Sequence, residues 1–135
     1  MKTTDELEHM IKEDARTIKN VSKNTKSAKI LLDALIKEKG LSSSKIGKDL
    51  GMSNYIYEIT SLSSTKNVSR EKLLCILMYL QADLEIMNEI LQSFGHSKIY
   101  VKVEYDAILY YCIKNNYTLD QTNVFLMENG FDPLI

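Results

Sequence analysis

The chain has 135 residues, 44% of them hydrophobic, a formal net charge of −1 and a single proline, which suits one compact domain with a true core. Few proline and glycine breaks, with leucine, isoleucine, lysine and glutamate abundant, predict an all-α protein. The longest apolar run, over residues 73–80, is too short to span a bilayer, and the polar N-terminus has no signal-peptide core, so we expect a cytoplasmic protein without a membrane partner.

Residues 1–27 have mixed charge and a weak apolar pattern. Five apolar side chains recur there at spacings of three to four residues: Leu7, Met10, Ile11, Ala15 and Ile18. This spacing predicts a short amphipathic helix, and the polar residues 20–27 read as a linker after it. The pattern leaves three arrangements open for the helix, namely packing on the body of the protein, exchange with a partner, or mobility.

Helices are predicted next over residues 28–39 and 43–50, and a third begins after Ser53. Gly40 ends the first of them and Ser42 caps the second. The buried stripe expected on the first helix consists of Ile30, Leu31, Ala34 and Leu35. Gly47 lies four residues before Gly51, and this spacing lets two short helices meet around a tight turn while the second projects from the surface. A DNA major groove accepts such a helix.

A polar loop over residues 61–68 precedes two more predicted helices, over 70–81 with Ser69 as cap and over 83–94 with Asp83 as cap. The second half of the chain then repeats with an offset of 35 residues. The equivalent positions are Leu84, Asn88, Leu91, Gly95 and Ile99 in the first copy and Leu119, Asn123, Leu126, Gly130 and Leu134 in the second. Each copy reads as helix, turn, helix and glycine stop, so each hairpin must stack on the other to bury its apolar face. The repeat is either an extension of the core or a surface for dimerisation or peptide binding.

These motifs resemble the Cro/C1-type (XRE-like) helix-turn-helix family over residues 28–92. The resemblance lies in Gly40-Leu41-Ser42, Ile46-Gly47, Leu50-Gly51-Met52-Ser53 and Ser69-Arg70-Glu71-Lys72. The tail, with Asp106-Ala107-Ile108 and Gly130-Phe131-Asp132-Pro133-Leu134, is similar to a C-terminal extension of such proteins in Firmicutes. The resemblance implies a Cro/C1-like five-helix helix-turn-helix domain over residues 28–95. We expect residues 1–27 to form an N-terminal amphipathic helix and linker before it, and residues 96–135 to form a second helical hairpin packed on it.

The resemblance also implies which residues meet DNA, because the second and third helices of the family reach phosphates and bases. The implied DNA-binding residues are Ser43, Lys45 and Lys48 in the second helix, Ser53, Asn54, Tyr55 and Glu58 in the third, and Lys66 and Arg70 after it. The sequence departs from the family pattern in three ways. The third helix has no lysine or arginine, the loop after it is longer and nearly neutral, and the stretch 51–59 is one residue shorter. Each departure removes phosphate or base contacts.

Charge is distributed unevenly along the chain. Residues 28–72 carry eight basic and five acidic side chains, whereas residues 73–135 carry three basic and eight acidic ones. The positive segment coincides with the helix-turn-helix pattern, as phosphate contact requires. We therefore expect a transcriptional regulator that binds double-stranded DNA as a homodimer and places its third helix in the major groove. The alternative is a protein-binding module on the same scaffold, such as a mobile-element regulator, antitoxin or inhibitor, with a partner held through the acidic tail.

Catalytic and metal-binding motifs do not occur in the sequence. Cys75 and Cys112 lie in apolar patterns without a C-x-x-C pair, and His9 and His96 have no ligand partners at zinc-like spacing. Neither a phosphate-binding glycine motif nor a Ser-His-acid arrangement is present. We expect no enzyme activity, no catalytic residue, no metal and no cofactor.

Overall fold

The computed structural model describes residues 27–61 and 68–134, and these are helical with no strand. Residues 27–38 form the first described helix. The others are α2 (Ser43–Leu50), α3 (Ser53–Thr60), α4 (Arg70–Tyr79), α5 (Leu84–Ser93), α6 (Glu104–Lys114) and α7 (Leu119–Glu128). The predicted all-α class is confirmed for this part of the chain. The helix predicted around residues 7–18 and most of the polar loop lie outside the described residues.

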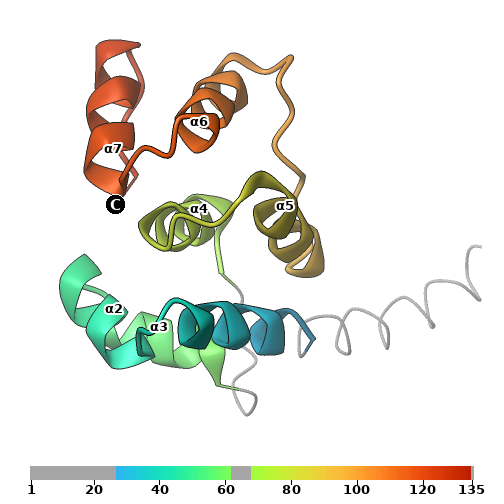
Figure 1. Ribbon diagram of the computed structural model, residues 1–135, viewed down its shortest axis with the longest axis vertical. Coiled ribbons are helices and arrows are strands. Elements are labelled where there is room, and N and C mark those ends of the chain that lie inside the picture. The colour runs from blue at the N-terminus through green and yellow to red at the C-terminus, as the bar shows by residue number, and fades with distance from the viewer. Residues whose placement is uncertain (1–26, 62–67, 135) are drawn as a thin grey trace, which may run out of the picture.

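The helices are arranged in tiers along the longest axis of the molecule. Residues 27–38, α2 and α3 lie at one end, α6 and α7 lie at the other, and α4 and α5 lie between them (Figure 1). Within the described ranges, no helix has both the length and the apolar character needed to cross a membrane.

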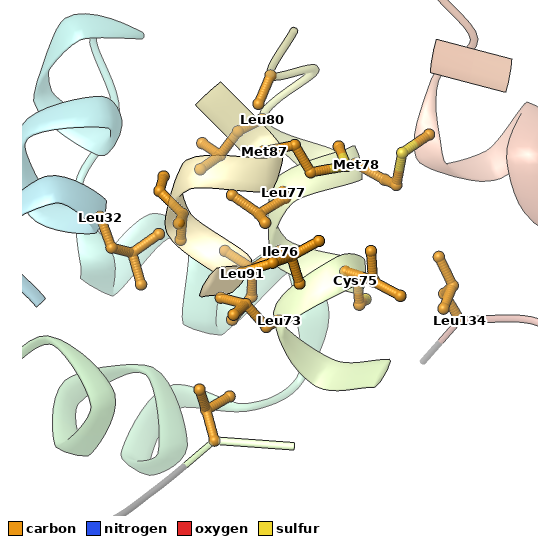
Figure 2. Close-up of a cluster of buried hydrophobic side chains, with 14 of the residues drawn as sticks. Leu32, Leu73, Cys75, Ile76, Leu77, Met78, Leu80, Met87, Leu91 and Leu134 are labelled. Carbon is orange, nitrogen blue, oxygen red and sulfur yellow. The ribbon is translucent and has the colours of Figure 1, made fainter. Parts of the chain in front are cut away.

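The core is centred on α4. Its residues 73–78 are all buried, which is the pattern of a helix covered on every side. In Figure 2, Leu32 approaches α4 from the N-terminal helices, and Leu134 approaches Cys75 and Met78 from the opposite side. Each fully buried leucine or isoleucine of this kind contributes about 1.5–3 kcal/mol relative to exposure. The helix α4 therefore holds the two ends of the molecule together.

The buried stripe predicted for the first described helix is wrong at two of its four positions. Ile30 is 56% exposed and Ala34 is exposed, whereas Leu35 is buried and Leu31 is half-buried against the core. The observed stripe is Ala28, Leu32, Leu35 and Ile36. Both sets recur at helical spacing, so the periodicity alone does not select between two apolar faces. Contact with the core cluster around α4 makes the selection.

Lys29 points inward on this helix. Its Nζ donates to the carbonyl oxygens of Glu58 at 3.3 Å and Ser61 at 3.0 Å, at the C-terminal end of α3. A cation there complements the negative end of the α3 dipole. Burial lowers the pKa of Lys29 because desolvation disfavours the charged ammonium.

Three of the predicted helix caps are confirmed. The side chains of Ser42, Ser69 and Asp83 each accept a hydrogen bond from the backbone N–H three residues later, at 3.1, 3.2 and 2.9 Å. The helix α3 differs from the prediction because it begins at Ser53, with Met52 as the N-cap and no side-chain cap. It therefore starts, like α6, without the side-chain hydrogen bond that caps α2, α4, α5 and α7.

The 35-residue repeat is present as two helical hairpins, α4–α5 and α6–α7. Asn88 accepts a hydrogen bond from the backbone N–H of Ile99 at 2.9 Å, and Asn123 accepts one from the N–H of Leu134 at 2.7 Å. The inter-helix turns also match, with positive φ at Gln81 and, in the equivalent place, at Asn116. In both copies, therefore, an asparagine in the second helix of the hairpin holds the backbone of an apolar residue 11 positions later against that helix.

Candidate nucleic-acid interface

The crossing of α2 and α3 depends on Gly47. A Cβ at this position would lie 2.7 Å from the Ser53 Cα and 2.8 Å from a methyl carbon of Ile56, so no larger residue fits without displacing the α3 backbone. Gly51, between the helices, has a φ of 67°, in the left-handed region that glycine adopts without steric cost. The backbone N–H of Met52 then donates to the Gly47 carbonyl at 2.7 Å. The angle at which α3 leaves the turn is therefore held by local sterics and hydrogen bonds.

One side of α3 is buried and the other is open. Ile56 and Ile59 are buried, whereas Ser53, Asn54 and Tyr57 are exposed. Tyr57 is 68% exposed, the most exposed large hydrophobic side chain in the described part of the chain. The helices α6 and α7 lie on the far side of α4 from α3 (Figure 1). Helix α4 therefore separates α3 from the acidic second hairpin.

The predicted site residues of α2 are accessible to different degrees. Lys45 and Lys48 are exposed and Ser43 is half-buried. The Lys45 Nζ lies 3.3 Å from the Asp49 carboxylate in an exposed pair, and such pairs contribute little. The Tyr79 hydroxyl also donates to Asp49. Hydrogen bonds from Tyr79 and Lys45 lower the pKa of Asp49, because both favour the ionised carboxylate.

Tyr55 and Glu58 are half-buried rather than fully presented. The Tyr55 hydroxyl accepts a hydrogen bond from the Ser69 N–H at 3.3 Å, and the Lys72 ammonium lies 5.3 Å from the centre of the Tyr55 ring. These contacts connect α3 to the start of α4.

Lys72 is a cation beside α3 that the sequence reasoning missed. It lines a hollow of about 590 Å³ together with residues 51–55, the turn and first residues of α3. Lys72 belongs to the Ser69–Lys72 motif, but the spacing of residues along the sequence does not indicate that the first turn of α4 contacts α3. The structure thus adds one positive charge to the α2–α3 surface.

Arg70 has a different role from the one that the resemblance implied. Its guanidinium donates to both carboxylate oxygens of Asp106, at 3.2 and 2.9 Å, and to the carbonyls of Ser97 and Lys98, at 3.1 and 3.2 Å. The Asp106 side chain is 7% exposed and that of Arg70 is 22% exposed. Arg70 therefore joins α4 to α6 and to the connector between the hairpins, and we leave it out of the candidate interface. Lys66 lies outside the described residues.

Comparison with known proteins gives no relative on which to base a function: no family model matches the chain, and no curated protein or solved structure matches it.

Proposed function

We propose that this protein is a helix-turn-helix regulator that binds double-stranded DNA with α3 in the major groove. The observation that supports the proposal most directly is the α2–α3 unit. Its crossing requires Gly47, and it leaves Ser53, Asn54 and Tyr57 exposed on the outer side of α3. A projecting second helix of this kind matches the groove in width.

The side chains available for base and phosphate contact are few. Asn54 is the residue suited to bidentate recognition of adenine, and Ser53 can donate to or accept from several bases. Lys72 supplies positive charge beside the start of α3, and Lys45 and Lys48 are exposed on α2. If each of these three lysines neutralises one phosphate, affinity per protomer falls about 40-fold between about 50 and about 200 mM salt. The proposal thus predicts modest, salt-sensitive binding in which sequence selection depends on Asn54.

The test begins with selection of bound fragments from genomic DNA by the full chain at low salt. Fluorescence anisotropy on a selected fragment then measures affinity against salt. The double substitution Lys45→Glu with Lys48→Glu should abolish binding, and the matched pair Lys98→Glu with Lys102→Glu, on the exposed connector, should not. Glutamate three residues after the Ser42 cap completes a capping box, so helix α2 should stay folded in the test variant.

Two results would overturn the proposal. One is the failure of the full chain to retain any DNA at low salt. The other is an equal loss of affinity in the α2 pair and the connector pair, because a general loss of charge would then explain both.

The same surface supports a second candidate, a protein-binding module. Helix α3 has no lysine or arginine, and its most exposed large hydrophobic side chain is Tyr57. Tyrosine is enriched at the energetic centres of protein interfaces. This candidate predicts that the chain binds no DNA at any salt concentration. It also predicts that a protein partner is retained by the wild-type chain and lost on Tyr57→Ala, but kept on Tyr100→Ala, a matched exposed tyrosine of the connector.

A further inference from the structure

A hollow of about 460 Å³ lies where the start of α4, the start of α6 and residues 131–134 meet, and we call it the α4–α6 hollow. Tyr105 and Phe131 line it, with their rings edge-on and the ring centroids 5.5 Å apart. Glu71, Lys72 and Asp132 add charged groups to the lining. An aromatic wall with a few charged groups, in a hollow of this size, is typical of a site for a small ligand or a single side chain.

The 35-residue repeat gives this hollow a counterpart in the first hairpin. Tyr105 is equivalent to Arg70, and residues 132–134 are equivalent to residues 97–99. Arg70 and residues 97–99 line a hollow of their own beside the connector. The hydrogen bonds from Asn88 and Asn123 hold the two backbone segments in the same way. The first hairpin therefore shows what this backbone arrangement can bind.

A guanidinium occupies the counterpart in the first hairpin. Arg70 donates to the carbonyl oxygens of Ser97 and Lys98 at 3.1 and 3.2 Å, and to the carboxylate of Asp106. In the second hairpin the equivalent of Arg70 is the aromatic Tyr105, so the chain supplies no guanidinium from this position. The two carbonyls that the guanidinium meets in the first hairpin belong, in the second, to residues 132 and 133.

The lining of the α4–α6 hollow favours a cation. Among its described lining residues, the carboxylates of Glu71 and Asp132 outnumber the single ammonium of Lys72. Asp132 replaces Ser97 of the first hairpin, so a carboxylate is gained beside the shared carbonyls. Burial and, after it, the charge of Glu71 raise the pKa of Tyr105, which indicates that this carboxylate acts on the aromatic wall. The faces of aromatic rings also attract cations.

We propose that the α4–α6 hollow binds the guanidinium group of an arginine that is supplied by another molecule. The guanidinium meets the carboxylates of Glu71 and Asp132, and the aliphatic stem lies along Tyr105 and Phe131. A guanidinium suits this site better than an ammonium because its planar fork of five donors serves several acceptors at once. Lys72 is placed in the same hollow to pair with the carboxylate of free arginine.

Titration of the full chain with L-arginine at constant ionic strength, followed by NMR of the backbone amides, tests the proposal. The amides of residues 71, 131, 132 and 134 should shift saturably, with a dissociation constant in the low millimolar range or below, as expected for a ligand of this size. L-Citrulline, in which a neutral ureido group replaces the guanidinium, should cause no saturable shift. The proposal is overturned if L-arginine leaves these amides unchanged, or if L-citrulline binds equally well.

Two pairs of carboxylates separate this hollow from acidic surfaces in general. Glu71→Gln with Asp132→Asn should raise the dissociation constant for L-arginine about tenfold or more, because charge-assisted hydrogen bonds are lost. The control is Asp120→Asn with Glu128→Gln, since these exposed carboxylates line a different aromatic hollow along α7. The control pair should leave the dissociation constant unchanged, and an equal loss in both pairs contradicts the proposal.

Substitution of Tyr105 tests the equivalence of the two hairpins. Tyr105→Arg supplies a guanidinium from the chain itself, as Arg70 does in the first hairpin, and should abolish the binding of L-arginine. Tyr105→Phe keeps the ring and should retain binding within about twofold. Circular dichroism shows whether each variant keeps its helices. Undiminished binding by a folded Tyr105→Arg variant overturns the proposal.

A blocked arginine distinguishes two sources of the same group. N-Acetyl-L-arginine methylamide imitates an arginine within a protein and has no free carboxylate. Tighter binding of free L-arginine, with the advantage lost on Lys72→Met, identifies the free amino acid as the source, whereas equal binding of the two ligands identifies an arginine of a partner chain. Either result supports a guanidinium site. Because no DNA is present, these outcomes are independent of the proposed regulatory function.

Discussion

Replacement of Arg70 by methionine separates a structural role from a DNA-binding role. The substitution keeps much of the aliphatic stem and removes the guanidinium, with its four hydrogen bonds to Asp106, Ser97 and Lys98. Asp106 would keep only the bond from the Tyr100 N–H, at 2.8 Å. A nearly buried carboxylate would then lack its counter-charge at the junction of α4, α6 and the connector.

The expected loss of stability follows from this burial. Removal of one partner from a buried ion pair costs about 3–5 kcal/mol. Because the Arg70 side chain is 22% exposed, we expect the low end of that range, about 3 kcal/mol. For a chain of this length, that corresponds to a decrease in Tm of about 10 °C. An exposed phosphate-binding arginine would change the free energy of unfolding by no more than about 0.5 kcal/mol.

Urea unfolding followed by helical circular dichroism measures this loss directly. Lys102→Met, on the exposed connector, is the matched control and should leave the free energy of unfolding unchanged. A double-mutant cycle with Asp106→Asn should give a coupling energy of about 2 kcal/mol, because the two residues act as a pair. The reasoning is refuted if Arg70→Met unfolds at the wild-type urea concentration, or if the cycle shows no coupling.

Three further substitutions test the fold. Gly47→Ala should lower the free energy of unfolding by about 1–3 kcal/mol through overpacking. The higher helix propensity of alanine offsets about 1 kcal/mol of this loss, and a thermal melt measures the net change. Tyr79→Phe removes the hydrogen bond that lowers the pKa of Asp49. The folded-state pKa of Asp49 lies below its unfolded-state pKa, so the variant should lose most stability at pH values above the unfolded-state pKa. This loss should disappear as the pH falls through the folded-state pKa. Urea midpoints measured at a series of pH values would show this dependence. Asn123→Ala breaks both hydrogen bonds to the Leu134 backbone and should cost about 1–3 kcal/mol, with faster hydrogen exchange at the Leu134 amide.

Features encoded by nearby residues could be predicted from the sequence. The caps at Ser42, Ser69 and Asp83 each involve an acceptor and a donor three residues apart. The spacing of Gly47 and Gly51 likewise indicated two short helices that meet around a tight turn, and the structure has this close crossing. These interactions lie within one or two helical turns, so the order of residues specifies them.

Features that depend on distant partners could not be predicted in the same way. The sequence shows two apolar faces on residues 27–38, and packing against the α4 core buries the one with Leu32. Arg70 meets a carboxylate 36 positions away, and its partner follows from how the second hairpin docks on the first. Lys72 joins the α2–α3 surface because the first turn of α4 lies beside Tyr55.

The sequence by itself therefore determined the helical class, three of the helix caps and the duplicated hairpin, because hydrogen bonding and periodicity act over a few residues. Only the tertiary structure decided which face of each helix is covered, where the buried charges pair, and which apolar side chains stay exposed on the second hairpin. Those outcomes follow from burial and desolvation, which depend on all the neighbours of a residue in space and not only on its neighbours along the chain.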